Sequence, residues 1–221
     1  VVLPVSLVDV IGWIATCVGA LLGLPQLIRL LRTRNLDGLS LFAWRAVLVL
    51  NIVWFAHGLQ INQPPQLVTN AVALGTTLPL LVLLSRSLGR SLAKVLLPSL
   101  AAAAVIIAVD VQLGSLAFGI AAIIPGLLAN TGQSIEVVRA PKVTGISPLF
   151  LVLAFVNQAL WITWAVLLPD PGTIAAAALT LALTAFNLTW YVLRRFGLRP
   201  MFLRAADRPA AQVVERELTH A

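Results

Sequence analysis

Residues 23–40 read GLPQLIRLLRTRNLDGLS, a stretch in which an apolar helix contains a proline and an amide and then ends in charged residues. Pro25 lacks a backbone N–H, and its ring displaces the carbonyl one turn earlier, so it bends or interrupts a helix. Inside a bilayer, an unpaired backbone group costs several kcal/mol unless protein or water satisfies it. The stretch therefore predicts a membrane helix that other helices surround.

The composition of the whole chain also indicates a membrane protein. Of its 221 residues, 60% are hydrophobic and 10% are charged, whereas soluble domains are about one quarter charged. The single cysteine, Cys17, excludes an internal disulfide, and we expect it to be a small buried side chain. Apolar runs of about 20 residues predict seven transmembrane helices, over roughly residues 8–32, 40–60, 65–88, 94–112, 115–139, 146–168 and 172–194.

The basic residues predict how these helices are oriented. Apart from Arg45 near the start of the second apolar run, they lie at the ends of the first, third, fifth and seventh runs or just after them, and the opposite connections contain neither lysine nor arginine. The positive-inside rule then places the N-terminus outside and the C-terminus in the cytoplasm, in a plasma or inner membrane. Orientation accounts for most of the net charge of +7, so we expect no nucleic-acid partner. We expect residues 198–221 to form a cytoplasmic tail.

An internal repeat divides the chain. Sliding the sequence along itself by 107 residues, the separation of Gln26 from Gln133, aligns further glycine, arginine, serine and tryptophan pairs without a gap. Three helices reverse the direction of the chain across a bilayer, and a single linker helix restores it, so the two copies are parallel. We therefore predict an all-α fold of two parallel three-helix bundles, residues 8–88 and 115–195, joined by a linker helix at 94–112.

The motif at the end of the first helix resembles that of a known family. Pro25 and Gln26, the basic residues after them, the sequence Asp-Gly-Leu-Ser at 37–40 and the 3+1+3 layout resemble the PQ-loop superfamily. Within it, the chain is most similar to the SWEET sugar transporters and their single-repeat SemiSWEET relatives. The resemblance implies a central pocket that opens to either side as the bundles rock about hinges. The hinge residues would be Pro25 and Gln26 in one copy, and Gly132 and Gln133 in the other, which lacks the proline.

Amide and tryptophan side chains are the predicted solute-binding groups. Asn51 and Trp54 lie three residues apart and share a helix face, and the repeat offset places Gln158 and Trp161 at the equivalent positions. An indole packs against the apolar face of a sugar ring, and amides both donate and accept hydrogen bonds. The same side chains could instead form an interfacial aromatic belt and interhelix hydrogen bonds.

The third helix of each copy contributes unequally to this predicted site. The resemblance implies that Asn70 contacts the solute, as the asparagine at similar spacing does in the related transporters. The repeat offset places Ala177 opposite it, and Thr180, one turn further, could supply a hydroxyl. The missing second asparagine weakens the assignment of a sugar.

Two further residues are candidates for proton coupling. His57 stands where the relatives have a tyrosine, and a histidine titrates near neutral pH. Asp37 lies in the loop after the motif, where proton-coupled relatives also have acidic residues. His57 fits equally an ordinary interfacial polar residue, and Asp37 fits a loop cap.

Three functions remain open from the sequence. The first is a transporter of a small neutral polar solute, most simply a sugar, by facilitated alternating access without a cofactor. The second is a proton-coupled carrier of an amino acid or another zwitterion, and the third is a non-transporting membrane receptor or adaptor. The motifs of catalytic, nucleotide-binding and metal-binding sites are missing from the sequence, so we expect no enzyme, no catalytic residue and no metal site. The oligomeric state stays open, a homo-oligomer included.

Overall fold

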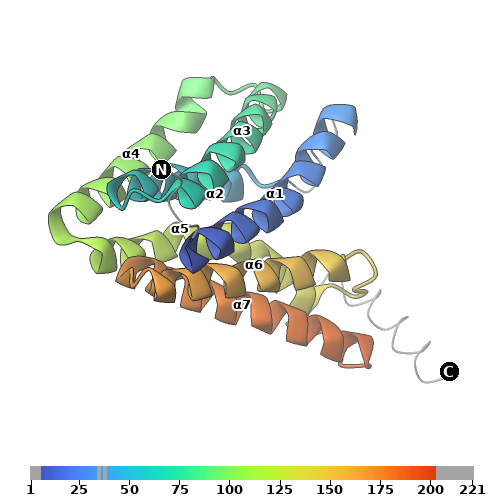
Figure 1. The fold of residues 1–221 in the computed structure, drawn as a ribbon. Helices are drawn as coiled ribbons and strands as arrows, with labels where there is room; N and C mark the ends of the chain where they lie inside the picture. Colours follow the sequence, from blue (N-terminus) through green and yellow to red (C-terminus); the bar gives the residue numbers. More distant parts are fainter. Residues whose placement is uncertain (1–5, 34–35, 37–38, 203–221) are drawn as a thin grey trace, which may run out of the picture.

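The computed structural model describes residues 6–33, 36 and 39–202, without the side chains at 25–27, 29–31 and 33. The described residues form helices and the connections between them, with no strand among them (Figure 1). The helices are α1 (Leu7–Thr33), α2 (Leu41–Gln60), α3 (Pro64–Ser87), α4 (Leu92–Leu113), α5 (Ser115–Arg139), α6 (Pro148–Leu167) and α7 (Pro171–Arg195). The seven are long and apolar enough to cross a membrane, which confirms the prediction of an all-α fold with seven membrane-spanning helices.

Local sequence explains where these helices begin. The side chains of Ser40, Ser91, Ser147 and Asp170 each accept a hydrogen bond from the backbone N–H three residues later, as N-cap residues do. Prolines occupy the first turns of α3, α6 and α7, where no N–H is needed. The predicted helix boundaries lie within two residues of these.

The helices pack in the same order in both halves of the chain. Helix α3 contacts both α1 and α2, and helix α7 contacts both α5 and α6. Between the halves, α1 packs on α6 and α2 packs on α5, while α4 packs on α2, α3 and α5. The first helix of each half therefore lies against the second helix of the other.

Close helix crossings occur at repeat-related positions. A Cβ atom on Gly12 of α1 would lie 2.9 Å from the ring of Pro65 in α3, and one on Gly119 of α5 would overlap the backbone of Gly172 in α7. These two pairs stand 107 residues apart. Small residues that permit close backbone approach are typical of membrane helix interfaces.

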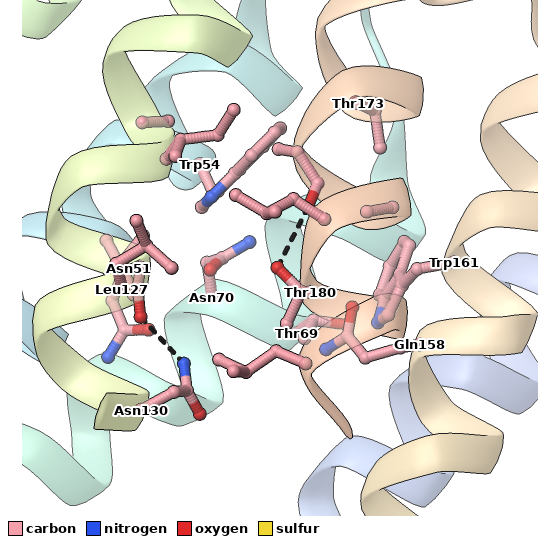
Figure 2. A pocket seen from close by; sticks show the side chains of 18 of the residues that line it. Asn51, Trp54, Thr69, Asn70, Leu127, Asn130, Gln158, Trp161, Thr173 and Thr180 are labelled. Carbon is pink, nitrogen blue, oxygen red and sulfur yellow. Dashed lines mark hydrogen bonds between the residues drawn. The ribbon is translucent and has the colours of Figure 1, made fainter. Parts of the chain in front are cut away.

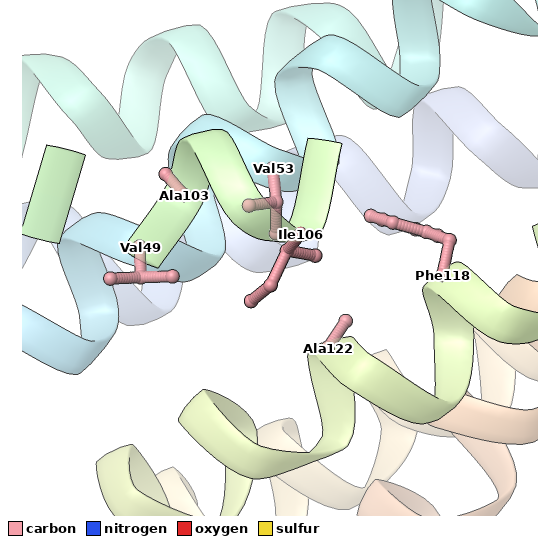
Figure 3. Close-up of a cluster of buried hydrophobic side chains, with 6 residues drawn as sticks. All are labelled: Val49, Val53, Ala103, Ile106, Phe118 and Ala122. Carbon is pink, nitrogen blue, oxygen red and sulfur yellow. The ribbon is translucent and has the colours of Figure 1, made fainter. Parts of the chain in front are cut away.

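Buried apolar side chains join the two halves through α4. One cluster links α2, α4 and α5 (Figure 3) and consists of Val49, Val53, Ala103, Ile106, Phe118 and Ala122. A second cluster lies at the other end of the second half, around Val137, Leu151 and Tyr191. The expectation that Cys17 is buried is wrong, because its side chain is exposed on α1. A small apolar thiol on a membrane helix can face lipid as readily as protein.

Candidate functional site

A cavity of about 220 Å³ lies between the two halves of the chain, with lining residues from α2, α3, α5, α6 and α7 (Figure 2). The structure brings all six of the residues predicted to bind solute to this cavity: Asn51, Trp54, Asn70, Gln158, Trp161 and Thr180. Typical ligand pockets start at about 300 Å³, so the volume suits a small solute.

Other aromatic rings hold the two indoles in the cavity wall. The ring of Trp54 meets Phe118 edge to face at 4.8 Å between centroids, and the ring of Trp161 meets Trp164 edge to face at 5.3 Å. Phe118 and Trp164 are fully buried. Edge-to-face contacts stabilise an aromatic pair beyond the burial of its area. The indoles are therefore fixed surfaces on two different helices, α2 and α6.

Backbone carbonyls fix the orientation of three amides in the wall. Asn70 Nδ2 donates to the carbonyl of Gln66 at 2.8 Å, Asn130 Nδ2 donates to that of Gly126 at 2.9 Å, and Gln66 Nε2 donates to that of Trp54 at 3.1 Å. A carbonyl oxygen can only accept, so each amide must present its nitrogen to the protein. The amide oxygens have no protein donor among the described residues, which makes them acceptors for another molecule.

Two hydroxyl groups of the wall also use their hydrogens within the protein. Thr180 Oγ1 donates to the carbonyl of Ala176 at 2.9 Å, and Thr69 Oγ1 donates to that of Pro65 at 2.8 Å. Thr173 Oγ1 is buried and has no hydrogen-bond partner within the described part of the chain. A hydroxyl that donates to the backbone keeps lone pairs that can accept. The cavity thus offers several oxygen atoms that can accept hydrogen bonds.

The cavity wall carries no formal charge over the residues that the structure describes. Its lining residues are apolar, amide, hydroxyl or indole side chains, and none is an aspartate, glutamate, lysine, arginine or histidine. An ion that leaves water for such a site loses its hydration without gaining a counter-charge. The wall is therefore suited to a neutral molecule that has hydrogen-bond donors and an apolar face.

His57 lies beside this cavity and contacts two carboxylates. Its Nδ1 lies 2.7 Å from Asp110 Oδ2 in α4, and its Nε2 lies 3.2 Å from Asp170 Oδ2 at the start of α7. The side chain is only 1% exposed. The interpretation of His57 as an interfacial polar residue is wrong, because its two acidic partners and the stacked ring of Phe118, 4.3 Å away, enclose it.

The predicted hinge and loop residues are placed less fully. The backbone of α1 is helical through Pro25 and Gln26, but their side chains, and all of Asp37, lie outside the described residues. Gly132 and Gln133 lie within α5, and neither is among the residues that line the cavity.

Sequence reasoning missed five residues of the site and its surroundings: Gln66, Thr69, Asn130, Asp110 and Asp170. Asn130 directly follows a long apolar run and lies one turn before Gln133, and that polarity would have been a usable signal. Asp110 and Asp170 lie near the ends of apolar runs, where nothing in the local sequence indicates burial. Their burial, at 5% and 6% exposure, follows from tertiary contacts with His57 that no local pattern encodes.

Comparison with known proteins supports part of this description. Residues 7–67, which cover α1, α2 and the start of α3, match the family model described as PQ loop repeat. No curated protein matches the chain. The first half therefore carries a PQ-loop repeat, as the resemblance to the PQ-loop superfamily predicts, and the seven long apolar helices indicate an integral membrane protein.

Proposed function

We propose that this PQ-loop repeat protein transports a small neutral polar solute, most simply a mono- or disaccharide, by facilitated alternating access. The observation that carries the proposal is the uncharged cavity, in which two indoles with fixed orientations lie among amide oxygens that have no donor in the described part of the chain. Sugar hydroxyls can donate to such oxygens, and the C–H face of a sugar ring can pack on indole.

We also propose that the transporter works as two three-helix bundles, residues 8–88 and 115–195, that move about the linker helix at 94–112. The matched packing orders of α1–α3 and α5–α7 support this division. So do the repeat-related crossings at Gly12 and Gly119. Bending at Pro25 and Gln26, and at Gly132 and Gln133, would let each bundle tilt, with the N-terminus outside the cell and the C-terminus in the cytoplasm.

A proton-coupled carrier is the second candidate, and the buried carboxylate contacts of His57 favour it. The cavity itself argues against a zwitterion as the solute, since its described lining residues offer no ionic partner for an ammonium or a carboxylate group. Coupling and solute class are therefore separate questions, and each needs its own measurement.

A thermal-shift panel tests the solute class. The purified protein would be heated with hexoses, disaccharides and amino acids in turn, because a ligand that binds only the folded state raises stability, by about 2.7 kcal/mol at 100 times its dissociation constant. We expect a sugar to raise the melting temperature and amino acids to leave it unchanged. A shift with amino acids alone would reject a sugar as the solute, and a protein partner bound without any solute flux would favour the receptor.

Variants of the cavity wall locate the binding site. We expect Trp54→Leu and Asn70→Ala to weaken sugar binding about tenfold or more, which corresponds to about 1.4 kcal/mol. Trp13→Leu is the control for the first substitution, because Trp13 is 42% exposed on α1. Thr163→Ala is the control for polar truncation, because Thr163 is an exposed residue of α6 that bonds only its own helix. Equal affinity in all four variants would mean that the cavity is not the binding site.

A further inference from the structure

Asp110, His57 and Asp170 form a buried cluster that joins three parts of the chain. His57 belongs to α2 in the first half, Asp110 to α4, and Asp170 is the N-cap of α7 in the second half. The contacts are 2.7 Å from Nδ1 to Asp110 and 3.2 Å from Nε2 to Asp170. Each ring nitrogen therefore faces a carboxylate oxygen.

Counting hydrogens shows that these contacts need a proton beyond the one on neutral imidazole. A neutral ring has one N–H, and its other nitrogen presents a lone pair. Facing two ionised carboxylates, such a ring would make one hydrogen bond and one repulsive contact. An imidazolium has two N–H groups and donates to both carboxylates. The observed geometry therefore needs one proton more than a neutral ring and two ionised carboxylates supply.

Asp170 is held as the ionised partner in this cluster. Its oxygens accept from the backbone N–H of Thr173 at 2.8 Å, from the hydroxyl of Ser115 and from His57. Burial tends to raise the pKa of Asp170, but the hydrogen bonds from His57, Ser115 and Thr173 outweigh it and hold the pKa well below its usual range. Asp170 thus accepts the hydrogen bond from His57 Nε2.

The other groups around the ring are not ionisable. Phe118 of α5 stacks on it at 4.3 Å, and Trp54 meets it edge to face at 5.8 Å. Gln60 Nε2 donates to Asp110 Oδ2 at 2.9 Å. Asp110 from α4 and Asp170 from the start of α7 are the titratable groups that face His57 among the described residues. Within that part of the chain, no arginine or lysine competes for these carboxylates.

The cluster also lies next to the cavity. Trp54 and Thr173 line the cavity, and each directly contacts a member of the cluster, Trp54 through the ring of His57 and Thr173 through Asp170. A change in the contacts of His57 therefore affects the segments of α2 and α7 that line one end of the cavity. This is the end nearest Asp110 and Asp170.

We propose that Asp110, His57 and Asp170 form a binding site for one exchangeable proton, and that this proton, carried as a His57 imidazolium, fastens α2 to α4 and α7. Loss of the proton leaves one nitrogen lone pair facing a carboxylate and raises the net negative charge of the cluster, so α2 separates from its partners at this end. The proton site does not depend on the identity of the solute.

Nitrogen NMR of the imidazole tests the proton directly. The chain has two histidines, and His220→Gln leaves His57 as the only one, so ¹⁵N-histidine labelling of the full chain in lipid nanodiscs reports on His57 alone. We expect both ring nitrogens to carry hydrogen at pH 7, and Asp110→Asn to lower the pH at which the proton is lost by about one unit or more. Asp9→Asn, an acid of the first turn of α1 that bonds Ser6, should leave the titration unchanged.

Two results would overturn the proton site. One is a neutral imidazole at pH 7 in the chain that keeps both aspartates, a measurement that stands even if Asp110→Asn does not fold. The other is a folded Asp110→Asn protein whose His57 titrates as it does in the Asp9→Asn control. Neither result involves solute movement, so a failure here is distinguishable from a failure of the transport proposal.

Thiol labelling tests whether the proton holds α2 against α4 and α7. In a Cys17→Ser, Ala177→Cys protein, a membrane-impermeant thiol reagent applied from the Asp110 and Asp170 side reports access to the cavity, which Ala177 lines. We expect the labelling rate to rise several-fold as the pH passes the His57 midpoint. The comparison is the same protein with His57→Gln, whose pH dependence reflects thiol ionisation alone. Identical dependence of the labelling rate on pH with and without His57 would overturn the proposal that the proton holds α2 against α4 and α7.

Discussion

A buried amide or indole in a membrane helix can pack helices together or can contact a ligand, and its partners distinguish the two uses. Asn51 Nδ2 donates to Thr77 Oγ1 at 3.0 Å, so Asn51 both ties α2 to α3 and lines the cavity. Trp164 is fully buried and would lie 2.8 Å from a Cβ atom on Gly12, so it packs helices. Trp54 and Trp161 instead line the cavity.

Asp170 carries a prediction about stability and pH at the residue scale. Because its pKa is depressed in the folded protein, its hydrogen bonds contribute stability above the unfolded pKa of about 3.9, and that contribution is lost as the pH falls through the folded value. We expect Asp170→Asn to unfold more easily than the wild type in detergent at pH 5–6, by a margin that shrinks below about pH 4.

Chemical unfolding followed across that pH range measures the margin. Asp9→Asn serves again as the control, since Asp9 accepts hydrogen bonds only from Ser6 in its own N-terminal turn. A wild-type advantage over Asp170→Asn that grew as the pH fell below about 4 would contradict the assignment of Asp170 as the ionised member of its cluster.

The helices are held at their basic ends by arginines that bind backbone carbonyls. Arg45 of α2 donates from Nε to the carbonyl of Val95 at 2.7 Å and so contacts the first turn of α4. Arg194 of α7 is buried, and its Nη2 donates to the carbonyl of Ala140 at 2.6 Å, just beyond α5. The last carbonyls of a helix lack intrahelical donors, and Arg194 supplies donors to those of α5. Both arginines therefore join elements as well as setting orientation.

Arg194→Leu should destabilise the junction of α5 and α7. The substitution removes the donors to four carbonyls, those of Val137, Val138, Ala140 and Pro141, and an unsatisfied buried acceptor costs about 1–3 kcal/mol. Arg195→Leu, at the neighbouring exposed position, should change the free energy of unfolding little. Equal losses in the two variants, measured by thermal unfolding in detergent, would show that the carbonyl contacts do not stabilise the junction.

We expect two glycines of α5 to have different roles, one in close helix packing and the other in helix flexibility. Gly119→Ala would push a methyl group into the carbonyl of Gly172, and we expect a loss of about 1–3 kcal/mol. Gly132 has nothing within 4 Å of the same added atom, so Gly132→Ala should be neutral or stabilising, by up to about 1 kcal/mol.

Thermal unfolding of both glycine variants measures the difference. If Gly132 acts as a hinge, Gly132→Ala would also slow solute exchange without lowering the melting temperature. A Gly119→Ala protein as stable as the wild type would contradict the close crossing of α5 and α7.

At the scale of the whole molecule, periodic and compositional patterns predicted the fold well. Apolar runs gave the seven helices to within two residues of their ends, because a bilayer dictates both length and composition of a spanning helix. The repeat offset also led to Trp161 and Gln158, which line the cavity together with Trp54 and Asn51.

Contacts between distant segments could not be predicted in the same way. The cluster around His57 joins residues 53 and 113 positions apart, and the two aspartates carry no local sign of burial. Asn130 has Gly23 at the equivalent position of the first copy, so the repeat gave no reason to select it. A pattern that follows from symmetry cannot locate residues at which the two halves differ.

The most direct test of the account is uptake of labelled glucose and sucrose into liposomes that contain only the purified protein, with no ion gradient. We expect saturable uptake of at least one sugar by the wild type and unchanged uptake rates in Thr163→Ala and Trp13→Leu. In Trp54→Leu and Asn70→Ala, we expect the uptake rate to fall at least about tenfold. Uptake of amino acids without any sugar, or sugar uptake that survives both cavity substitutions unchanged, would contradict the account.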